Sequence, residues 1–420
     1  MSELYTLPDG WEWSNFKDSL YLTDFVANGS FASLKENVNY LDKKDYAILV
    51  RLKDFSSKWN GDYIYVDKHS YDFLSKSSLN ENDIMMCNVG SVGLHFRVPN
   101  LGQPMTIGPN SILIRPSVNY LDNSFLYYYF SSNIFKDFLE TIIAKTAQPK
   151  FNKTGFKTLS IPLPSLEEQK RIVAKLDNLF AKIDKAIALH QKNIDEANVF
   201  MASVLNNVFV ELEEKYKYTK LKNAVTKEKT SIKRGPFGSA LKKSFFVEKG
   251  YLVYEQYHAL NNDFSMERYY IDENKFNELK GFEVKAGDII ISCSGAYLGK
   301  LAIIPNDFTK GIINQALLKL SLNKNIIINE LFVYFWNNLM NNGFFDVVKK
   351  GAAIPNMPAV KELKEINIPL PELPIQQKVV SYLDEISQKM EKIKQIQKEK
   401  MQSLKALKAS ILDQAFKGEL

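Results

Sequence analysis

The sequence predicts an α+β protein of two tandem mixed α/β globular units, each followed by one long helix, with the two helices forming an antiparallel coiled coil. Three observations predict this fold class. The string IPLPSLEEQKRIVAKLD recurs as IPLPELPIQQKVVSYLD, so that residues 161–209 align without a gap on residues 368–416. Shorter strings ahead of both copies repeat at offsets of about 204 to 207 positions. Apolar residues then recur at three- and four-residue spacing, as in a coiled coil.

Each globular unit consists of short, Gly- and Asn-punctuated strands with an aromatic-rich helix near its end. The repeated strings are GSFAS and GPFGS, YVD and YID, NDIMMCNVGSVG and GDIIISCSGAYLG, NSILIRP and NQALLKL, and FLYYYF and LFVYFW. We therefore place the globular units at residues 1–160 and 213–367, and the helical segments at residues 161–212 and 368–420.

Prolines separate each globular unit from its helix, because proline is excluded from helix interiors and holds the preceding residue in an extended conformation. These prolines are Pro162, Pro164, Pro369, Pro371 and Pro374. Each helix is expected to begin just beyond them and to run for about 35 to 40 residues, or roughly 50 to 60 Å.

The helices are expected to pack along an apolar seam that turns polar near its middle. The seam runs Leu176, Leu179, Ile183, Ala186, His190, Asn193, Ala197, Phe200, Val204 in one helix and Leu383, Ile386, Met390, Ile393, Gln397, Lys400, Leu404, Leu407, Ile411 in the other. In an antiparallel pair His190 should approach Lys400 and Asn193 should approach Gln397. This polar layer either fixes the register of the helices or is simply a solvated waist.

Composition narrows the class of protein. The chain has 420 residues, of which 45% are apolar and 24% charged, enough for two or three cored domains. No apolar run approaches the roughly 18 residues that span a bilayer, and no export signal precedes the first unit, so we expect no membrane association and a cytoplasmic location. Two cysteines, Cys87 and Cys293, are expected to be buried, and the four histidines have no metal-ligand spacing.

Basic residues concentrate between the two halves. Ten of them, with a single acid, Glu228, lie in residues 215–243: Lys215, Lys217, Lys220, Lys222, Lys227, Lys229, Lys233, Arg234, Lys242 and Lys243. Such a cluster is typical of a phosphate-binding surface, although a solvated segment between domains gives the same pattern.

The tandem organisation, the paired IPLP strings with Gln169 and Gln376, the paired G-x-F-x-S strings and LPDGWEW near the start together resemble the specificity subunits of type I restriction-modification enzymes over essentially the full length. The resemblance implies two target recognition domains, each reading one half of an asymmetric, bipartite double-stranded DNA site. It also implies that the helices set the spacer and dock two methyltransferase subunits, and through them the restriction subunits.

With this resemblance, three groups of residues become candidates for DNA contact. Lys227, Lys229, Lys233, Arg234, Lys242 and Lys243 are assigned to the phosphate backbone. The G-x-F-x-S strings contribute Gly29, Phe31, Ser33, Gly235, Phe237 and Ser239, with an ordinary anchored turn as the alternative. GAYLGK lacks the full phosphate-loop pattern and is expected to form a turn in which Lys300 contacts phosphate.

The chain is expected to be non-catalytic and to bind no cofactor or metal, because it has no Pro-Pro-aromatic signature and no glycine-rich loop suited to S-adenosylmethionine. The resemblance places S-adenosylmethionine in the adenine methyltransferase subunit, and ATP and magnesium in the restriction subunit. The alternative of another class is a scaffold that does not bind DNA and uses the helices alone.

Overall fold

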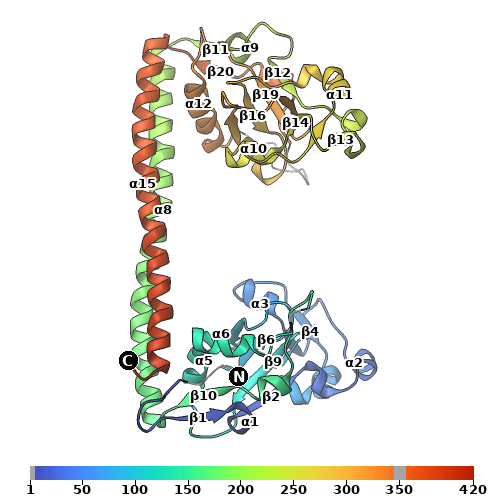
Figure 1. The fold of residues 1–420 in the computed structure, drawn as a ribbon, viewed down its shortest axis with the longest axis vertical. Coiled ribbons are helices and arrows are strands. Elements are labelled where there is room, and N and C mark those ends of the chain that lie inside the picture. Colours follow the sequence, from blue (N-terminus) through green and yellow to red (C-terminus); the bar gives the residue numbers. More distant parts are fainter. Residues whose placement is uncertain (1–4, 145, 345–355) are drawn as a thin grey trace. The chain divides into compact units, whose positions relative to one another are not determined.

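The computed structural model describes residues 5–144, 146–344 and 356–420. Residue contacts divide the chain into one unit of Met1–Gln191 with Lys398–Leu420 and a second unit of Lys192–Gln397. Each unit holds one mixed globular domain and stretches of two long helices (Figure 1). We call the globular part from β1 to β10 domain 1 and the part from β11 to β20 domain 2. The α+β class predicted from the sequence is confirmed.

Domain 1 contains three small sheets. Strands β2, β9, β6 and β7 form an antiparallel sheet in that order. Strands β4, β3, β8 and β5 form a mixed sheet in which β3 and β8 are parallel, and β1 pairs with β10. The bounds are β1 Glu12–Asn15, β2 Leu20–Asp24, β3 Ala47–Val50, β4 Ile64–Val66, β5 Ser78–Leu79, β6 Ile84–Cys87, β7 His95–Arg97, β8 Met105–Ile107, β9 Ser111–Pro116 and β10 Ser160–Leu163.

Domain 2 repeats this plan. Strands β12, β19, β16 and β17 form the antiparallel sheet, while β13, β15, β14 and β18 form the mixed sheet with β14 and β18 parallel. Strand β11 pairs with β20. The bounds are β11 Tyr218–Lys220, β12 Ile232–Arg234, β13 Phe246–Val247, β14 Tyr251–Tyr254, β15 Tyr270–Ile271, β16 Ile289–Ser292, β17 Leu301–Ile303, β18 Gly311–Ile313, β19 Leu317–Leu320 and β20 Asn367–Pro369.

Short helices cover the sheets of both domains (Figure 1). In domain 1 they are α1 Phe16–Ser19, η1 Phe25–Asn28, α2 Phe31–Asn37, α3 Leu52–Ser56, α4 Lys68–Phe73, η2 Ser75–Ser77, α5 Asn123–Ser131, α6 Asn133–Glu140 and α7 Lys153–Phe156. In domain 2 they are α9 Leu221–Ala224, η3 Gly238–Ala240, η4 Lys243–Phe245, α10 Gln256–Asn261, α11 Glu273–Glu278, η5 Lys280–Phe282, η6 Gly295–Tyr297, α12 Asn329–Asn341 and α14 Val360–Leu363.

The long helices are α8 Leu166–Lys215, of 50 residues, and α15 Leu373–Phe416, of 44 residues. Both are longer than the 35 to 40 residues expected from the sequence, because buried apolar side chains continue into the last turns of α8. The expectation that α15 begins beyond Pro374 is wrong. Proline is tolerated in a first helical turn, where its missing N–H has no partner to lose.

Within each unit the two helices run antiparallel. Lys408 Nζ, late in α15, lies 2.8 Å from the Asp184 carboxylate early in α8, and Lys394 Nζ donates to Asn198 Oδ1 at 3.1 Å. The inward face has four-three spacing. Buried or half-buried positions are Leu176, Phe180, Ile183, Ile187, His190, Ile194, Ala197 and Met201 in α8, and Leu383, Ser387, Met390, Lys394, Gln397, Met401, Leu404, Lys408 and Ile411 in α15.

Part of the expected seam is therefore wrong. Phe200, Ile393 and Leu407 were expected to face the partner helix but are 51%, 38% and 48% exposed. In α15 the neighbouring lysines, Lys394 and Lys408, take the inward positions instead. Their long stems pack against the other helix while their ammonium groups reach polar partners on it.

Each domain is fastened to its helix by a buried glutamine in the first turns of that helix. Gln169 Oε1 accepts the Asp122 N–H at 2.8 Å, and its Nε2 donates to the carbonyl oxygens of Tyr120 and Pro164 at 2.8 and 2.9 Å. Gln376 repeats this arrangement. Its partners are the N–H of Ile328 in domain 2, at 2.9 Å, and the carbonyl oxygens of Ile326 and Pro371, both at 2.8 Å.

The hydrophobic cores of the domains extend into the helices. In domain 1 a cluster that includes Phe16 and Phe130 continues to Leu176 of α8 and Phe416 of α15. In domain 2 the cluster around Trp336 likewise includes side chains from both helices. In the part of the chain that the structure describes, none of the helices combines the length and apolar character required of a membrane span.

Candidate nucleic-acid interface

The basic residues predicted to contact DNA lie around strand β12. Lys227 and Lys229 are exposed in the loop before it, Lys233 and Arg234 lie on the strand, and the exposed Lys242 and Lys243 follow η3. Among the described residues, none of these six side chains forms an ion pair with a carboxylate. Their positive charge is therefore available to an anionic ligand.

Other lysines of the same segment are already neutralised. Lys220 and Lys222 both pair with Glu365, and Lys215 pairs with Glu211. These hydrogen bonds, donated by Lys220 and Lys222, lower the pKa of Glu365 to about 2. The composition of residues 215–243 overstates the free charge, because partners such as Glu365 are distant in sequence.

In domain 2 the G-x-F-x-S string follows β12 directly. A Cβ on Gly235 would lie 1.9 Å from the carbonyl oxygen of Asn314, so only glycine fits this close approach of two backbones. Phe237 is 62% exposed, and the Arg234 guanidinium lies 5.2 Å from its ring centroid. Ser239 is exposed within η3. An exposed aromatic ring with an adjacent cation is a suitable surface for a base or a phosphate.

In domain 1 the matching string has a different local structure. The four residues of η1 separate β2 from Gly29, and the string then opens helix α2, where Ser30 caps the helix by accepting the Ser33 N–H. A Cβ on Gly29 would meet only side-chain atoms, at 3.2 Å or more. Phe31 is 84% exposed. Both strings therefore expose a phenylalanine, but with different backbone conformations: Phe31 begins helix α2, whereas Phe237 precedes η3.

The GAYLGK string forms a turn around η6, with Gly295 and Gly299 at φ values of 78° and 85°. Lys300 follows the turn and is exposed, while Tyr297 within it is 59% exposed. The expected turn is present, and contact between Lys300 and phosphate remains a prediction.

The four polar residues of the expected register layer lie near the middle of the long helices. Asn193 Nδ2 donates to Gln397 Oε1 at 3.3 Å, which is the approach expected from the sequence. His190 and Gln397 are half-buried, whereas Asn193 and Lys400 are exposed. The role of this layer in fixing the register remains a prediction.

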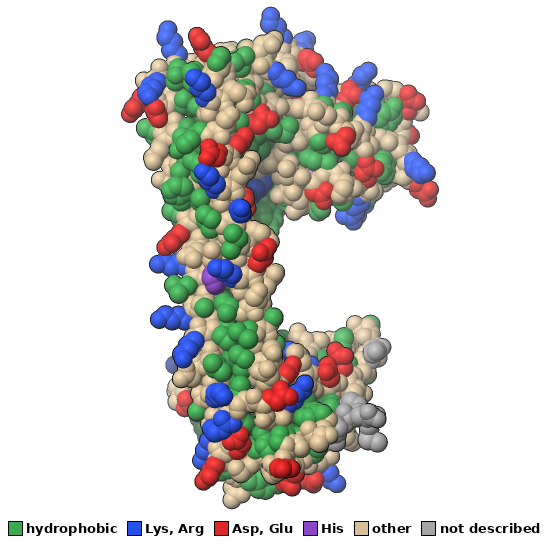
Figure 2. Space-filling model, turned by 60° about the vertical axis from the view of Figure 1, so that its left-hand side comes forward, with side chains coloured by type: hydrophobic (Ala, Val, Ile, Leu, Met, Phe, Trp, Pro, Cys, Tyr) green, Lys and Arg blue, Asp and Glu red, His purple; other side chains and the backbone are tan. Residues whose placement is uncertain are grey.

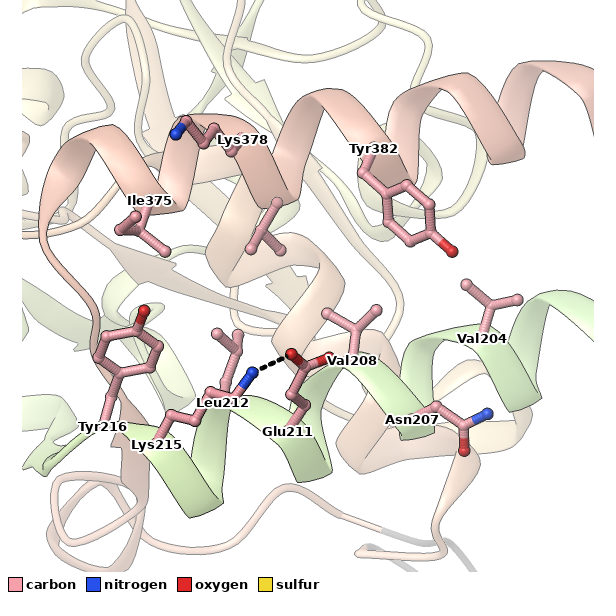
Figure 3. A pocket seen from close by; sticks show the side chains of 11 residues that line it. Val204, Asn207, Val208, Glu211, Leu212, Lys215, Tyr216, Ile375, Lys378 and Tyr382 are labelled. Atoms are coloured by element: carbon pink, nitrogen blue, oxygen red, sulfur yellow. Dashed lines mark hydrogen bonds and ion pairs between the residues drawn. The ribbon is translucent and has the colours of Figure 1, made fainter.

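The helices also carry exposed apolar side chains (Figure 2). Nine large ones are at least 37% exposed, namely Leu189, Val199, Phe200, Val210, Leu373, Tyr382, Ile393, Ile396 and Leu407. In the Lys192–Gln397 unit a groove of about 410 Å³ lies between the end of α8 and the start of α15 (Figure 3). Its walls include Val204 and Val208 of α8, and Ile375 and Tyr382 of α15, and Lys215 pairs with Glu211 at its edge.

Residues 5–144, 146–344 and 356–420 contain no group of three His, Cys, Asp or Glu side chains placed to hold a metal ion. Both cysteines are buried free thiols. Burial raises the pKa of Cys293 to about 11, against the opposing influence of nearby Arg234. Neither thiol is therefore suited to act as a nucleophile.

Sequence reasoning missed Asn356, whose Oδ1 accepts a hydrogen bond from Arg234 Nη2. Lys150 holds the equivalent place in domain 1, because Lys150 and Asn356 form matching isolated bridges with Val89 and Ser294. The signal was present as a weak match between PKF at Pro149 and PNM at Pro355. Its three residues were too few to be noticed without the structure.

Two similar mixed domains, each fastened by an equivalent glutamine to a long helix, define the class of proteins built from an internal repeat of one domain and one helix. A family model described as "Type I restriction modification DNA specificity domain" matches residues 33–199 and again residues 237–400. The chain belongs to this family, and each match covers most of one globular domain, beginning after β2 or β12, with part of the helix that follows.

Individual relatives agree with this assignment. The type I restriction enzyme MjaVIII specificity subunit of Methanocaldococcus jannaschii is 26% identical over 349 residues, which cover 78% of this chain and 77% of that protein. The EcoKI specificity subunit of Escherichia coli K12 is 22% identical over 439 residues, covering 99% and 90%. A solved chain described under "complex assembly" and "conformational transition of the type I R-M system" has a TM-score of 0.71, at 20% identity and with coverage of 99% and 100%, and shows the same fold.

Proposed function

We propose that the chain is the DNA specificity subunit of a type I restriction-modification complex, in which each globular domain recognises one half of an asymmetric, bipartite duplex target. The observation that carries this proposal is the double match of the DNA specificity domain, once to each half of the chain. The two domains differ in sequence outside the shared strings, so the two half-sites differ as well. A scaffold that uses the helices alone would not need two complete recognition domains.

The partners follow from the same proposal. Two methyltransferase subunits dock on the helix pair, whose exposed apolar side chains are the kind of surface that a protein partner covers. Restriction subunits join through them, and the helices set the spacer between the half-sites. The chain itself is non-catalytic: S-adenosylmethionine is held by the methyltransferase subunits, and ATP and magnesium by the restriction subunits. The complex works on DNA in the cytoplasm.

Replacing Lys227, Lys229, Lys242 and Lys243, which are exposed and form no ion pair with any described residue, with glutamine is expected to weaken binding to a random DNA duplex. Each lost phosphate contact should reduce the slope of log K against log salt by about 0.9, so the total reduction approaches 3 to 4 if all four lysines touch phosphate. The measurement is a fluorescence anisotropy titration of the assembled methyltransferase over a range of salt concentrations.

Four lysines that already have carboxylate partners provide the matched control, namely Lys215, Lys220, Lys222 and Lys285. Replacing them with glutamine removes the same formal charge but should change the salt slope less. An equal effect of both sets would show that general charge, rather than a surface around β12, attracts DNA. Binding of the unaltered complex without salt dependence would overturn DNA recognition itself.

Replacing His190, Asn193, Gln397 and Lys400 together with leucine tests the register layer. Apolar residues at the middle of a helix pair should leave the thermal stability unchanged or raise it, while removing the polar contacts that oppose a slip of one heptad. Such a slip moves one helix by roughly 10 Å along the other, about three base pairs of duplex. Methylome sequencing should then find methylated sites with more than one spacer length. Lower stability together with strict spacing would contradict a role in register.

A further inference from the structure

The ends of strands β2 and β12 occupy the same place in the two antiparallel sheets but carry opposite charges. In each sheet this strand pairs with the central strand, β9 or β19, which in turn pairs with β6 or β16. The equivalent rows of paired residues are Asp24–Ile112–Met86 in domain 1 and Arg234–Leu318–Ile291 in domain 2. The sheet register therefore equates Asp24 with Arg234.

Part of the neighbouring backbone is also the same in both domains, although η1 follows Asp24 in domain 1 alone. The Phe151 N–H donates to the Asn88 carbonyl at 3.1 Å, and the Met357 N–H donates to the Cys293 carbonyl at 2.8 Å. The bridges of Lys150 and Asn356 lie one residue away from these contacts. The side chains, in contrast, differ at every equivalent position, namely Asp24 and Arg234, Asn88 and Cys293, and Lys150 and Asn356. Two domains that read different DNA sequences need this combination of shared backbone contacts and different polar side chains.

In domain 2 this cluster presents hydrogen-bond donors. Arg234 Nη2 donates to Asn356 Oδ1, and the ring of Phe237 lies beside the guanidinium. Arg234 Nε is buried and has no oxygen or nitrogen acceptor among the described residues, while the Cys293 thiol lies close to the guanidinium. A buried donor without a partner is unfavourable, so an acceptor supplied by a ligand would be favoured. Arginine pairs best with O6 and N7 of guanine, which are both acceptors.

In domain 1 the cluster presents hydrogen-bond acceptors. Asp24 is 8% exposed, and its Oδ1 accepts the Ala27 N–H at 2.9 Å and Lys153 Nζ at 2.8 Å, which leaves Oδ2 for another donor. Asn88 Oδ1 is buried without a donor among the described residues. Asp24 and Asn88 both line a pocket of about 590 Å³ whose other walls include Phe31. Exocyclic amino groups of adenine or cytosine are the donors that DNA offers to a carboxylate in the major groove.

We propose that Asp24 and Arg234 are equivalent specificity-determining residues, which read bases of opposite hydrogen-bonding character in the two half-sites. Arg234, held by Asn356 and Phe237, reads a guanine in the half-site of domain 2. Asp24, together with Asn88, reads an amino-bearing base, adenine or cytosine, in the half-site of domain 1. This inference rests on the proposed function, because it names the residues through which that function is specific.

The test is to assemble Arg234→Gln and Asp24→Asn variants of the full chain with its methyltransferase subunits and to sequence the methylome of cells that carry them. Arg234→Gln should reduce discrimination at one base pair of one half-site from about 10- to 100-fold to near unity, and the lost base should be guanine. Asp24→Asn should do the same in the other half-site, and the lost base identifies adenine or cytosine. The matched controls Arg268→Gln, an exposed arginine of domain 2, and Asp42→Asn, an exposed aspartate of domain 1, should leave the motif unchanged.

Where a variant complex no longer methylates DNA, selection of bound duplexes from a randomised pool replaces the methylome. Loss of preference at a single base pair in that selection supports the proposal. Enrichment of the parental base at every position by both variants overturns it, as does a change in both half-sites from a single substitution. If the unaltered complex enriches no sequence at all, DNA recognition by this chain fails rather than the assignment of Asp24 and Arg234.

Discussion

Replacing Gln376 with leucine is expected to lower the free energy of unfolding of the Lys192–Gln397 unit by about 3 to 5 kcal/mol, because it leaves up to three backbone groups without partners at about 1 to 3 kcal/mol each. Gln376 is fully buried and satisfies one N–H and two carbonyl oxygens where domain 2 meets α15. Leucine fills a similar volume but can neither donate nor accept. Hydrogen exchange of domain 2 amides in increasing denaturant measures the loss.

Gln377→Leu is the matched control, because Gln377 is the next residue of the same helix and is exposed. It should change the stability by less than about 0.5 kcal/mol. Gln169→Leu should destabilise domain 1 and leave the exchange of domain 2 unaltered. If Gln376→Leu and Gln377→Leu changed the free energy of unfolding equally, the hydrogen bonds of the buried Gln376 amide would contribute nothing to stability beyond the helix propensity of the residue.

The sequence predicted these anchors as paired strings but not their function. Gln169 and Gln376 recur at the same distance after each IPLP string, and the repeat therefore located them. The partners of each amide could not be predicted, because two of the three lie 47 to 50 residues earlier, in loops whose course depends on the folded domain. The tandem organisation, in contrast, was predictable, because the repeated strings and the prolines before each helix can be read directly from the sequence.

The inward face of the helices was predicted only in part. Apolar character placed Ile393 and Leu407 inside, yet the structure exposes them and turns Lys394 and Lys408 inward. Hydrophobic periodicity cannot tell one apolar face from another when a helix carries two. A helix that must bind both its neighbour in the chain and a separate subunit carries two such faces.

The equivalence of Asp24 and Arg234 could not be predicted from the sequence. Domain 1 has four more residues than domain 2 between this strand and the G-x-F-x-S string. The G-x-F-x-S strings align at one offset, which pairs Gly29 with Gly235 and would match Arg234 to Asn28. The sheet register pairs Arg234 with Asp24 instead, because the four residues of η1 intervene in domain 1 alone. Only the hydrogen bonds between strands show which residues are equivalent.

The exposed apolar groove of the Lys192–Gln397 unit is the expected docking surface for one methyltransferase subunit, and a substitution there should have a large effect on its binding. Tyr382 is 51% exposed on its wall and has no apolar counterpart in the other half, since the helix repeat aligns it with Lys175. Ile375 likewise aligns with Glu168, which forms an ion pair with Arg171. Arg171 also donates to the carbonyl oxygen of Leu420 at 2.8 Å. The two docking faces of the proposed complex are therefore chemically different.

Tyr382→Asp is accordingly expected to weaken the binding of one methyltransferase subunit by about 100-fold and to leave the other in place, because a carboxylate buried in an apolar contact loses its hydration without gaining a partner. Native mass spectrometry should detect a complex with one methyltransferase subunit where the unaltered chain binds two. Tyr218→Asp is the matched control, since Tyr218 is also 51% exposed but lies on β11, outside the groove. Two bound subunits with unchanged affinity in the Tyr382→Asp complex would show that the groove is not a docking surface. Loss of both subunits would show that the two faces depend on each other, contrary to the independence that the different chemistry of Tyr382 and Lys175 predicts.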